Sequence, residues 1–366
     1  MRLVILQDFL RAGGTERQTL LLARSWKAEG LEVTVLCFRP GGKLERLASQ
    51  LEVPLRILQN FSTPFPFWAP NLMATLEDLD PEGLLLMGRN ANRLGKKLKR
   101  HFPKLPVIGT CRTGRPLAFG YAESLRKVDR VVCNSDWAVG RVREIGVAPE
   151  SLSVIPNART LDWDGESPQG LRKKTRLELG ISPETCVLLQ VAAFVSGKNH
   201  SDLLEVVGGL DSLELPWELW LVGEGKTLRP AKQMAKQLKI GQRIRFFGYH
   251  EDVRPFLAGA DLFVSTSLEE SLPNSLIEAQ SAGLPVVAYD VAGVRETFSP
   301  GESGVLCPEG DLGSFFESLK DLMADSEKRN RMGQAGVEFA KGFPDPLEQG
   351  RRYLEVFSGV GNKTAK

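Results

Sequence analysis

The chain has 366 residues, of which 42% are hydrophobic and 25% charged, so a disordered chain is excluded and two domains with separate cores are expected. The formal net charge of +2 covers an asymmetry: residues 1–165 hold 24 Lys and Arg against 17 Asp and Glu, whereas residues 166–366 hold 23 against 28. The basic first half is expected to face something anionic, and no apolar window is long enough to span a membrane.

Short apolar runs alternate with amphipathic segments along almost the whole chain, which predicts β-α-β units and parallel sheets. In the first half, strands are expected over residues 3–6, 33–37, 84–87, 107–109, 130–133 and 152–155, and helices over residues 16–28, 91–101, 121–127 and 137–145. In the second half, strands are expected over residues 187–191, 218–222, 244–246, 262–265, 285–288 and 304–306. Residues 157–170 are polar and turn-rich, as in a linker. We therefore predict an α/β protein of two doubly wound, Rossmann-like domains that face a cleft.

The N-terminal segment begins with an apolar run too short for a signal peptide. The cysteines are odd in number and scattered, without C-x-x-C spacing, so we expect buried reduced thiols and a cytoplasmic protein. After the first expected strand, Gly13 and Gly14 open a helix and would let the backbone approach a ligand closely. A tight turn is the simpler alternative. The pattern is not G-x-G-x-x-G, so a nicotinamide-binding fold is disfavoured.

An aromatic segment and a basic helix stand out in the first half. Residues 61–70 combine Phe and Trp with Pro, so they either fill a gap under a loop or form an apolar lip for a lipid. Basic side chains crowd residues 91–104, namely Arg93, Lys96, Lys97, Lys99, Arg100 and Lys104. These form either a solvated basic face or a peripheral contact with an anionic membrane at the inner face. Nucleic acid is not expected as a partner, because no recognition motif accompanies the charge.

Two D-x-D spacings raise the question of a metal. Asp162 and Asp164 lie in the predicted linker, and Asp78 and Asp80 lie at a polar helix exit. Hard cations do prefer grouped carboxylates, but neither place suits a built site. We expect no metal and no cofactor, because a lysine and a helix dipole can supply the positive charge.

The most informative stretch, residues 265–288, combines a strand end, a loop, a helix start and a further strand. Ser271 is expected to cap the helix, with Pro273 at its first position and Gly283 near its end. The first N–H groups of such a helix form an anion site suited to phosphate. The expected donors are the backbone N–H groups of Asn274, Ser275 and Leu276.

Two carboxylates flank this helix start. Glu270 precedes the helix and Glu278 lies eight positions later, inside it. Acids beside a phosphate suit the hydroxyls of an attached sugar. The simpler alternatives are a solvated loop acid for Glu270 and macrodipole complementarity for Glu278.

The string E-x7-E, followed by E-A-x-x-A-G-L-P-V-V, resembles the retaining nucleotide-sugar glycosyltransferases of family 4 (group 1). The resemblance covers most of the chain and implies a GT-B fold. It implies an acceptor-binding domain over residues 1–160, a nucleotide-sugar-binding domain over residues 161–345, and a helix over residues 346–366 that crosses back to the first domain. It also implies transfer of a sugar from a UDP- or GDP-sugar to a glycan or lipid-linked acceptor, with retention, in cell-surface polysaccharide or glycolipid synthesis.

The resemblance also implies roles for single residues. Lys198 would meet the donor diphosphate and Glu270 the transferred sugar, both as catalytic groups, while Glu278 would take the ribose hydroxyls. Gly13 and Gly14 would border the donor diphosphate. The nucleotide base would lie against the segments that contain Gly223, Phe247 and Gly248.

Two departures from the family pattern raise a rival. Ala193 stands where the family has an arginine, and no histidine stands near residues 110–115. Either Lys198 works alone, or an arginine supplies the second positive charge, namely Arg112, Arg115 or Arg295. The first two of these are candidate contacts for an anion or the acceptor. The rival is a catalytically inactive GT-B protein that binds sugar or nucleotide. The sequence does not name the base, the donor sugar or the acceptor.

Overall fold

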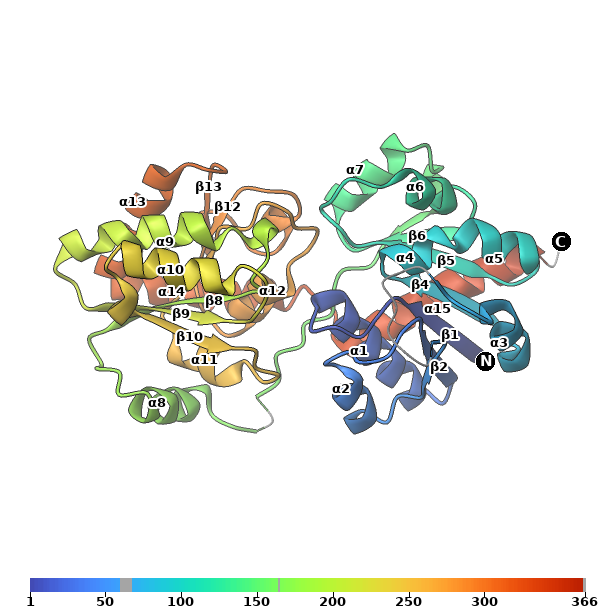
Figure 1. Cartoon of the computed structure of the whole chain (residues 1–366), viewed down its shortest axis with the longest axis horizontal. Helices are drawn as coiled ribbons and strands as arrows, with labels where there is room; N and C mark the ends of the chain where they lie inside the picture. Colours follow the sequence, from blue (N-terminus) through green and yellow to red (C-terminus); the bar gives the residue numbers. More distant parts are fainter. Residues whose placement is uncertain (60–67, 164, 365–366) are drawn as a thin grey trace. The chain divides into compact units, whose positions relative to one another are not determined.

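The computed structural model describes residues 1–59, 68–163 and 165–364. The chain divides into two compact units, one formed by Met1–Ala158 with Phe343–Lys366 and the other by Arg159–Gly342. Each unit contains one parallel β-sheet, with strand order β3-β2-β1-β4-β5-β6-β7 in the first and β10-β9-β8-β11-β12-β13 in the second. The predicted pair of doubly wound α/β domains is therefore confirmed (Figure 1).

The first unit alternates strands and helices and ends with a returning helix. Its elements are β1 (Arg2–Gln7), α1 (Gly14–Ala28), β2 (Glu32–Cys37), α2 (Glu45–Gln50), β3 (Leu55–Ile57), α3 (Leu72–Leu79), β4 (Gly83–Met87), α4 (Arg89–Arg93), α5 (Gly95–His101), β5 (Val107–Cys111), α6 (Phe119–Leu125), β6 (Arg130–Cys133), α7 (Asp136–Glu144), β7 (Leu152–Val154) and α15 (Pro346–Thr364).

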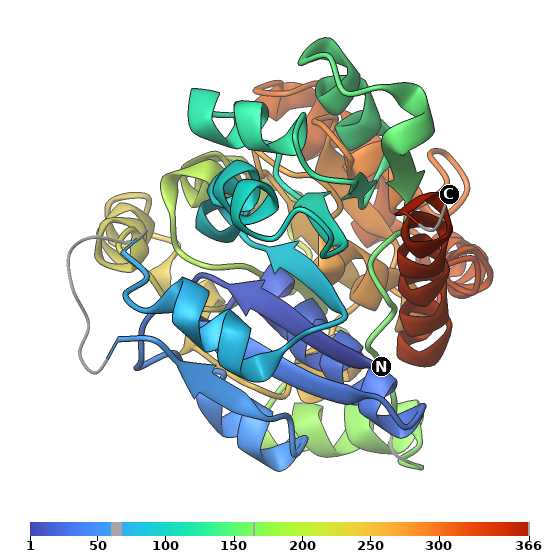
Figure 2. The ribbon, with the colours of Figure 1, turned by 90° about the vertical axis from the view of Figure 1, so that its right-hand side faces the viewer.

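Both faces of the first sheet are buried, which explains why its central strands contain runs of consecutive apolar residues, as in β1 and β4. Leu3 and Ile5 of β1 belong to one cluster, and Val4 and Leu6 belong to the cluster on the other face. The returning helix α15 supplies part of the first cluster, because Trp26 of α1 packs edge-on against its aromatic rings. Figure 2 shows α15 in dark red beside the strands of this unit.

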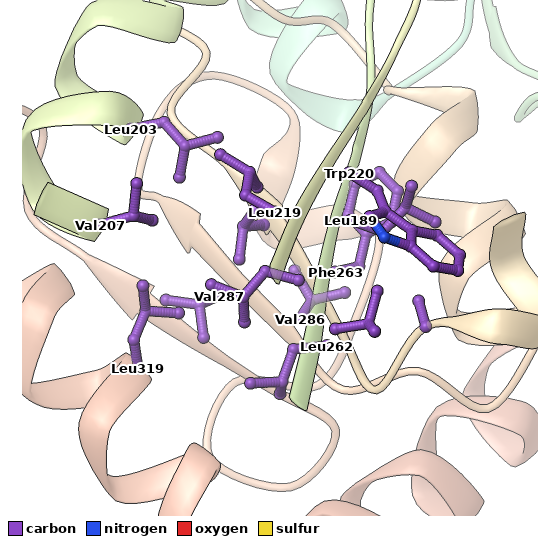
Figure 3. Packing of buried hydrophobic residues seen from close by; sticks show 14 of the residues in the cluster. Leu189, Leu203, Val207, Leu219, Trp220, Leu262, Phe263, Val286, Val287 and Leu319 are labelled. Carbon is purple, nitrogen blue, oxygen red and sulfur yellow. The ribbon is translucent and has the colours of Figure 1, made fainter. Parts of the chain in front are cut away.

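The second unit follows the same plan. Its elements are α8 (Pro168–Glu178), β8 (Cys186–Val191), α9 (His200–Gly208), β9 (Trp217–Val222), α10 (Leu228–Gln237), β10 (Ile244–Gly248), α11 (Arg254–Gly259), β11 (Leu262–Ser265), α12 (Asn274–Ser281), β12 (Val286–Tyr289), β13 (Gly304–Cys307), α13 (Leu312–Ala324) and α14 (Ser326–Ala340). Figure 3 shows Leu203 and Val207 of α9 on one side of the strands and Trp220 on the other. All three residues are fully buried.

The strand order places one topological switch point in each sheet. In the first sheet the order reverses between β1 and β4, and in the second between β8 and β11. Ligands of open α/β sheets bind beyond the carboxyl ends of the strands at such points. The loops after β1, β8 and β11 are therefore the places to look for a site.

Several elements differ from the sequence prediction. The single helix expected over residues 91–101 is two helices, α4 and α5, which are separated at Leu94. The edge strand β3 and the helices α2 and α3 were not predicted, because they are short and partly exposed. The last helix covers Pro346–Thr364, close to the range expected for it.

The five cysteines are buried with free thiols, as predicted. Across the described part of the chain, every helix is too short or too polar to cross a membrane.

Candidate functional site

Two loops meet at the switch point of the second sheet. The loop after β8 contains residues 192–199, and the loop after β11 contains residues 266–273. Two hydrogen bonds join them: Thr266 Oγ1 donates to the Asn199 carbonyl at 2.8 Å, and the Leu268 N–H donates to the Gly197 carbonyl at 2.9 Å. The backbone of one loop therefore fixes the position of the other.

These contacts bring together the two residues predicted to be catalytic. Lys198 and Glu270 form an ion pair between Nζ and Oε1. The side chains are 24% and 10% exposed, so the pair is only partly shielded from water. A lysine and a carboxylate that are 72 residues apart in the chain thus share one place at the carboxyl edge of the sheet.

The helix after Glu270 begins differently from the prediction. Pro273 occupies the N-cap position that was expected for Ser271 and is not the first helical residue. The Leu276 N–H, expected to be an anion donor, donates to the Pro273 carbonyl at 3.2 Å. The other two expected donors, Asn274 and Ser275, are the first two residues of α12.

Glu278 lies inside α12 and is buried. Its Oε1 accepts a hydrogen bond from Thr160 Oγ1 at 2.7 Å. A buried carboxylate needs such donors, because leaving a charge unsatisfied away from water is costly. Sequence reasoning missed Thr160, since no local pattern marks a contact 118 residues away.

The segments predicted to hold a nucleotide base end two neighbouring strands. The Gly223 N–H donates to the Gly248 carbonyl at 2.7 Å. Only glycine suits position 223, because its φ is +147° and a Cβ there would lie 1.9 Å from the Ala192 carbonyl oxygen. Phe247 packs against Trp220 and Phe256, with ring centroids 5.6 and 4.7 Å away. Its side chain therefore belongs to the apolar packing of the unit, and its backbone is the part suited to a base.

His200 follows Lys198 by two residues and is the first residue of α9. Its ring stacks on Phe194, with centroids 4.0 Å apart and planes at 11°, and its Nδ1 is buried without a hydrogen-bond partner in the described chain. Burial, and to a lesser degree the charge of Lys198, lowers the pKa of His200 to about 4. The ring is therefore neutral at neutral pH, and Lys198 carries the positive charge of this loop.

The loop after β12 packs on the loop that carries Glu270. Gly293 has φ +71°, and a Cβ there would lie 1.7 Å from the Ser271 carbonyl oxygen. Arg295 follows in a short 3₁₀ helix, Val294–Glu296, and forms an ion pair with Asp290. Its side chain is 65% exposed, so a ligand could reach the guanidinium.

In the first unit, buried carboxylates gather beyond the end of β1. Gly13 is the N-cap of α1 and Gly14 its first residue, as expected for the glycine pair. Glu16 is buried and accepts from Arg11 Nε at 2.6 Å. Asp8, which sequence reasoning missed, accepts from the backbone N–H groups that begin α4, at 2.9 and 2.6 Å. Burial raises the pKa of both carboxyls, although these donors and Arg11 oppose the shift.

The two arginines of the loop after β5 have different surroundings. Arg112 donates to Tyr353 Oη at 3.3 Å and to Asn157 Oδ1 at 2.5 Å, so its guanidinium anchors the returning helix α15. Arg115 is exposed. Arg112 therefore has a structural function in the first unit that the sequence did not reveal.

The aromatic and basic segments are only partly described. Residues 61–67 lie outside the described residues, and Trp68 is 44% exposed. Lys99 pairs with Asp129 at 2.9 Å, and Lys96 forms an ion pair with Glu123 although its side chain is half exposed. The other basic side chains of this group are exposed. A cavity of about 620 Å³ beside α5 is lined by Trp68, Leu72, Met73, Leu94 and Lys97, among others.

The D-x-D spacings have other partners. Asp78 and Asp80 form ion pairs with Arg56 and Arg2, at 2.8 and 2.6 Å. Asp162 offers its carbonyl to Arg254 at 3.3 Å, and Asp164 lies outside the described residues.

Comparison with known proteins agrees with this geometry. Residues 172–339 match the family described as glycosyl transferases group 1, and residues 12–163 match glycosyltransferase family 4. The chain is 29% identical over 338 residues to the lipopolysaccharide core biosynthesis glycosyltransferase LpsE of Rhizobium meliloti, which covers 90% of this chain and 91% of that protein. It is 24% identical over 330 residues to LpsD of the same organism, covering 89% of each chain.

Solved structures with low sequence identity share the fold. The crystal structure of Anabaena HepE in complex with UDP and glucose superimposes with a TM-score of 0.85 at 19% identity, over 98% of this chain and 99% of that one. WaaG, a glycosyltransferase involved in lipopolysaccharide biosynthesis, superimposes with a TM-score of 0.77 at 18% identity, over 98% of this chain and 100% of that one. These likenesses establish the GT-B fold.

Proposed function

The chain belongs to the group 1 glycosyltransferases of family 4, and from this premise we propose that it moves a sugar from a UDP- or GDP-sugar to a glycan or lipid-linked acceptor with retention. That it is a glycosyltransferase of polysaccharide synthesis follows from the family and from its lipopolysaccharide relatives. A nucleotide-sugar donor is supported by the complex of HepE with UDP and glucose.

The single observation that carries the proposal is the Lys198–Glu270 ion pair at the switch point. A diphosphate that leaves a sugar gains negative charge as the bond breaks, and an ammonium fixed beside it stabilises that charge. The N–H groups that begin α12, at Asn274 and Ser275, would share this task. No metal is needed for such a mechanism, and we propose that none takes part.

Glu270 would serve the sugar side of the same bond. Lys198 holds its carboxylate, and the next residue, Ser271, is in contact with Gly293. A carboxylate there accepts hydrogen bonds from sugar hydroxyls, and its charge responds to positive charge that develops on the ring. Binding of the donor diphosphate to Lys198 would loosen the ion pair and release Glu270 for the sugar.

A second positive charge is proposed for Arg295. Ala193 cannot supply one, and Arg112 already donates to Tyr353 and Asn157. Arg295 lies in the unit that contains Lys198, on the loop that packs against Ser271, and is largely exposed. Its guanidinium would exchange Asp290 for a phosphate oxygen when the donor binds.

The test begins with ligands. Thermal shifts with UDP, GDP, ADP and their sugars should show one base preferred, and the corresponding sugar nucleotide should then release free nucleotide when an acceptor is present. The anomeric configuration of the product, measured by NMR, tests retention. Binding without release, with any donor or acceptor, would favour the inactive sugar- or nucleotide-binding protein instead. An intact Lys198–Glu270 pair favours the enzyme.

We also propose a peripheral contact between the first unit and an anionic membrane at its cytoplasmic face, where a lipid-linked acceptor would lie. Exposed Arg93, Lys96, Lys97 and Arg100 support it, together with Trp68 beside the α5 cavity. Sedimentation with vesicles of anionic and neutral lipid tests this at low and high salt. Equal binding to both lipid types would contradict the proposal.

A further inference from the structure

Thr160 makes a contact that the mechanism above does not use. Its hydroxyl donates a hydrogen bond to Glu278 Oε1 at 2.7 Å, and Glu278 is only 9% exposed. Thr160 is the second residue of its unit, whereas Glu278 lies in the helix whose start is the proposed phosphate site.

The backbone around Thr160 is anchored within the same unit. Leu161 packs against the apolar cluster of that unit, and the Asp162 carbonyl accepts from Arg254 Nη1 at 3.3 Å. These two contacts hold the segment that carries the Thr160 hydroxyl in place. A donor held in this way restricts the rotation of the Glu278 carboxylate.

We propose that Thr160 is a positioning residue for nucleotide recognition: it holds the Glu278 carboxylate in the orientation that accepts the ribose hydroxyls of the donor. The inference rests on the proposed function, and on the ribose contact that the family resemblance implies for Glu278. A carboxylate has about four acceptor positions, so a bond from Thr160 does not by itself prevent Glu278 from accepting bonds from a vicinal diol. Thr160 would thereby contribute to the selection of ribonucleotides without touching them.

The test compares nucleotides that differ only in the ribose hydroxyls. Calorimetric affinities are measured for UDP and 2′,3′-dideoxy-UDP, with GDP and 2′,3′-dideoxy-GDP in parallel, on wild type, Thr160→Val and Thr160→Ser. Valine matches the shape of threonine without the hydroxyl, and serine keeps the hydroxyl. We expect Thr160→Val to weaken binding of the ribonucleotide about tenfold, the size of one hydrogen bond to a charged group, and to leave dideoxy binding unchanged. Thr160→Ser should bind both as wild type does.

A second comparison covers the case in which Thr160→Val folds poorly. In a Glu278→Ala background, the further change Thr160→Ala should alter ribonucleotide affinity less than twofold, because Glu278→Ala has already removed the acceptor of the Thr160 hydroxyl. An equal loss for ribo- and dideoxynucleotides, or no loss at all, would overturn the inference. If wild type binds neither UDP nor GDP, the proposed function itself fails. If wild type prefers the ribonucleotide and Thr160→Val keeps that preference, only the inference fails.

Discussion

The contact between Gly293 and the loop that carries Glu270 allows a sharp test of how the site is built. In Gly293→Ala, the new Cβ would lie 1.7 Å from the Ser271 carbonyl oxygen at φ +71°. The two groups must separate by roughly 1.5 Å before a non-bonded contact is tolerable. Because Ser271 follows Glu270 directly, we expect the carboxylate to move with it.

Gly301→Ala is the matched control. Position 301 has a similar φ of +85°, but no atom lies within 4 Å of the added Cβ. Both variants lose about 1–2 kcal/mol of unfolding free energy from the left-handed backbone. Gly293→Ala loses a further 1–3 kcal/mol or so from overpacking. For a unit of this size, about 1 kcal/mol corresponds to 2–4 °C in Tm.

The assay is Tm by thermal shift and kcat/KM from nucleotide release. We expect Gly301→Ala to keep nearly full activity, and Gly293→Ala to lose about 100-fold, the typical cost of a displacement near 1 Å in an active site. If Gly293→Ala matched Gly301→Ala in both Tm and kcat/KM, the Ser271 contact would not position Glu270.

Three other predictions concern charge. Arg295→Ala should raise the donor KM about tenfold, because a charge-assisted phosphate contact is lost. The control Arg115→Ala, in the other unit, should change the donor KM less than twofold. Equal effects of the two substitutions would show that Arg295 is not part of the donor site. Burial lowers the pKa of His200 from 6.5 to about 4, so the unfolded chain binds a proton on this ring more tightly than the folded chain does. The free energy of unfolding should therefore fall as the pH drops from 6.5 to about 4, by at most about 1.4 kcal/mol per pH unit. His200→Gln should show a shallower fall in urea midpoint between pH 7 and pH 4.5, and an unchanged slope would contradict the assignment. Arg112→Lys should lower Tm by a few degrees with little change in donor KM, since Arg112 anchors α15 through Tyr353 and Asn157; a change in donor KM alone would instead make Arg112 a ligand contact.

The alternating architecture could be predicted from the sequence because the central strands are buried on both faces and therefore contain runs of consecutive apolar residues, as in Leu84–Leu86. Short edge elements such as β3 were not predicted, because Leu55–Ile57 is half exposed and contains an arginine. The break at Leu94 could not be foreseen either. It follows a helix start that is fixed by Asp8, a residue of the loop after β1.

The site shows the same division. The sequence predicted Lys198 and Glu270 as partners in function, and the structure brings them into contact. Local rules misplaced the helix start, because Pro273 was assigned to the first helical position although its ψ of 118° is that of an N-cap. Contacts between distant residues, such as Thr160 with Glu278 and Arg112 with Tyr353, depend on the tertiary fold and leave no local pattern.

The most direct measurement of the central claim is kcat for nucleotide release from the preferred sugar nucleotide, at saturating donor and acceptor. It compares wild type with Lys198→Ala, Glu270→Gln and the exposed control Lys173→Ala. We predict a loss of at least about 100-fold for Lys198→Ala and Glu270→Gln, the usual cost of removing an electrostatic stabiliser, and no loss for Lys173→Ala. Wild-type kcat in both Lys198→Ala and Glu270→Gln would contradict the account.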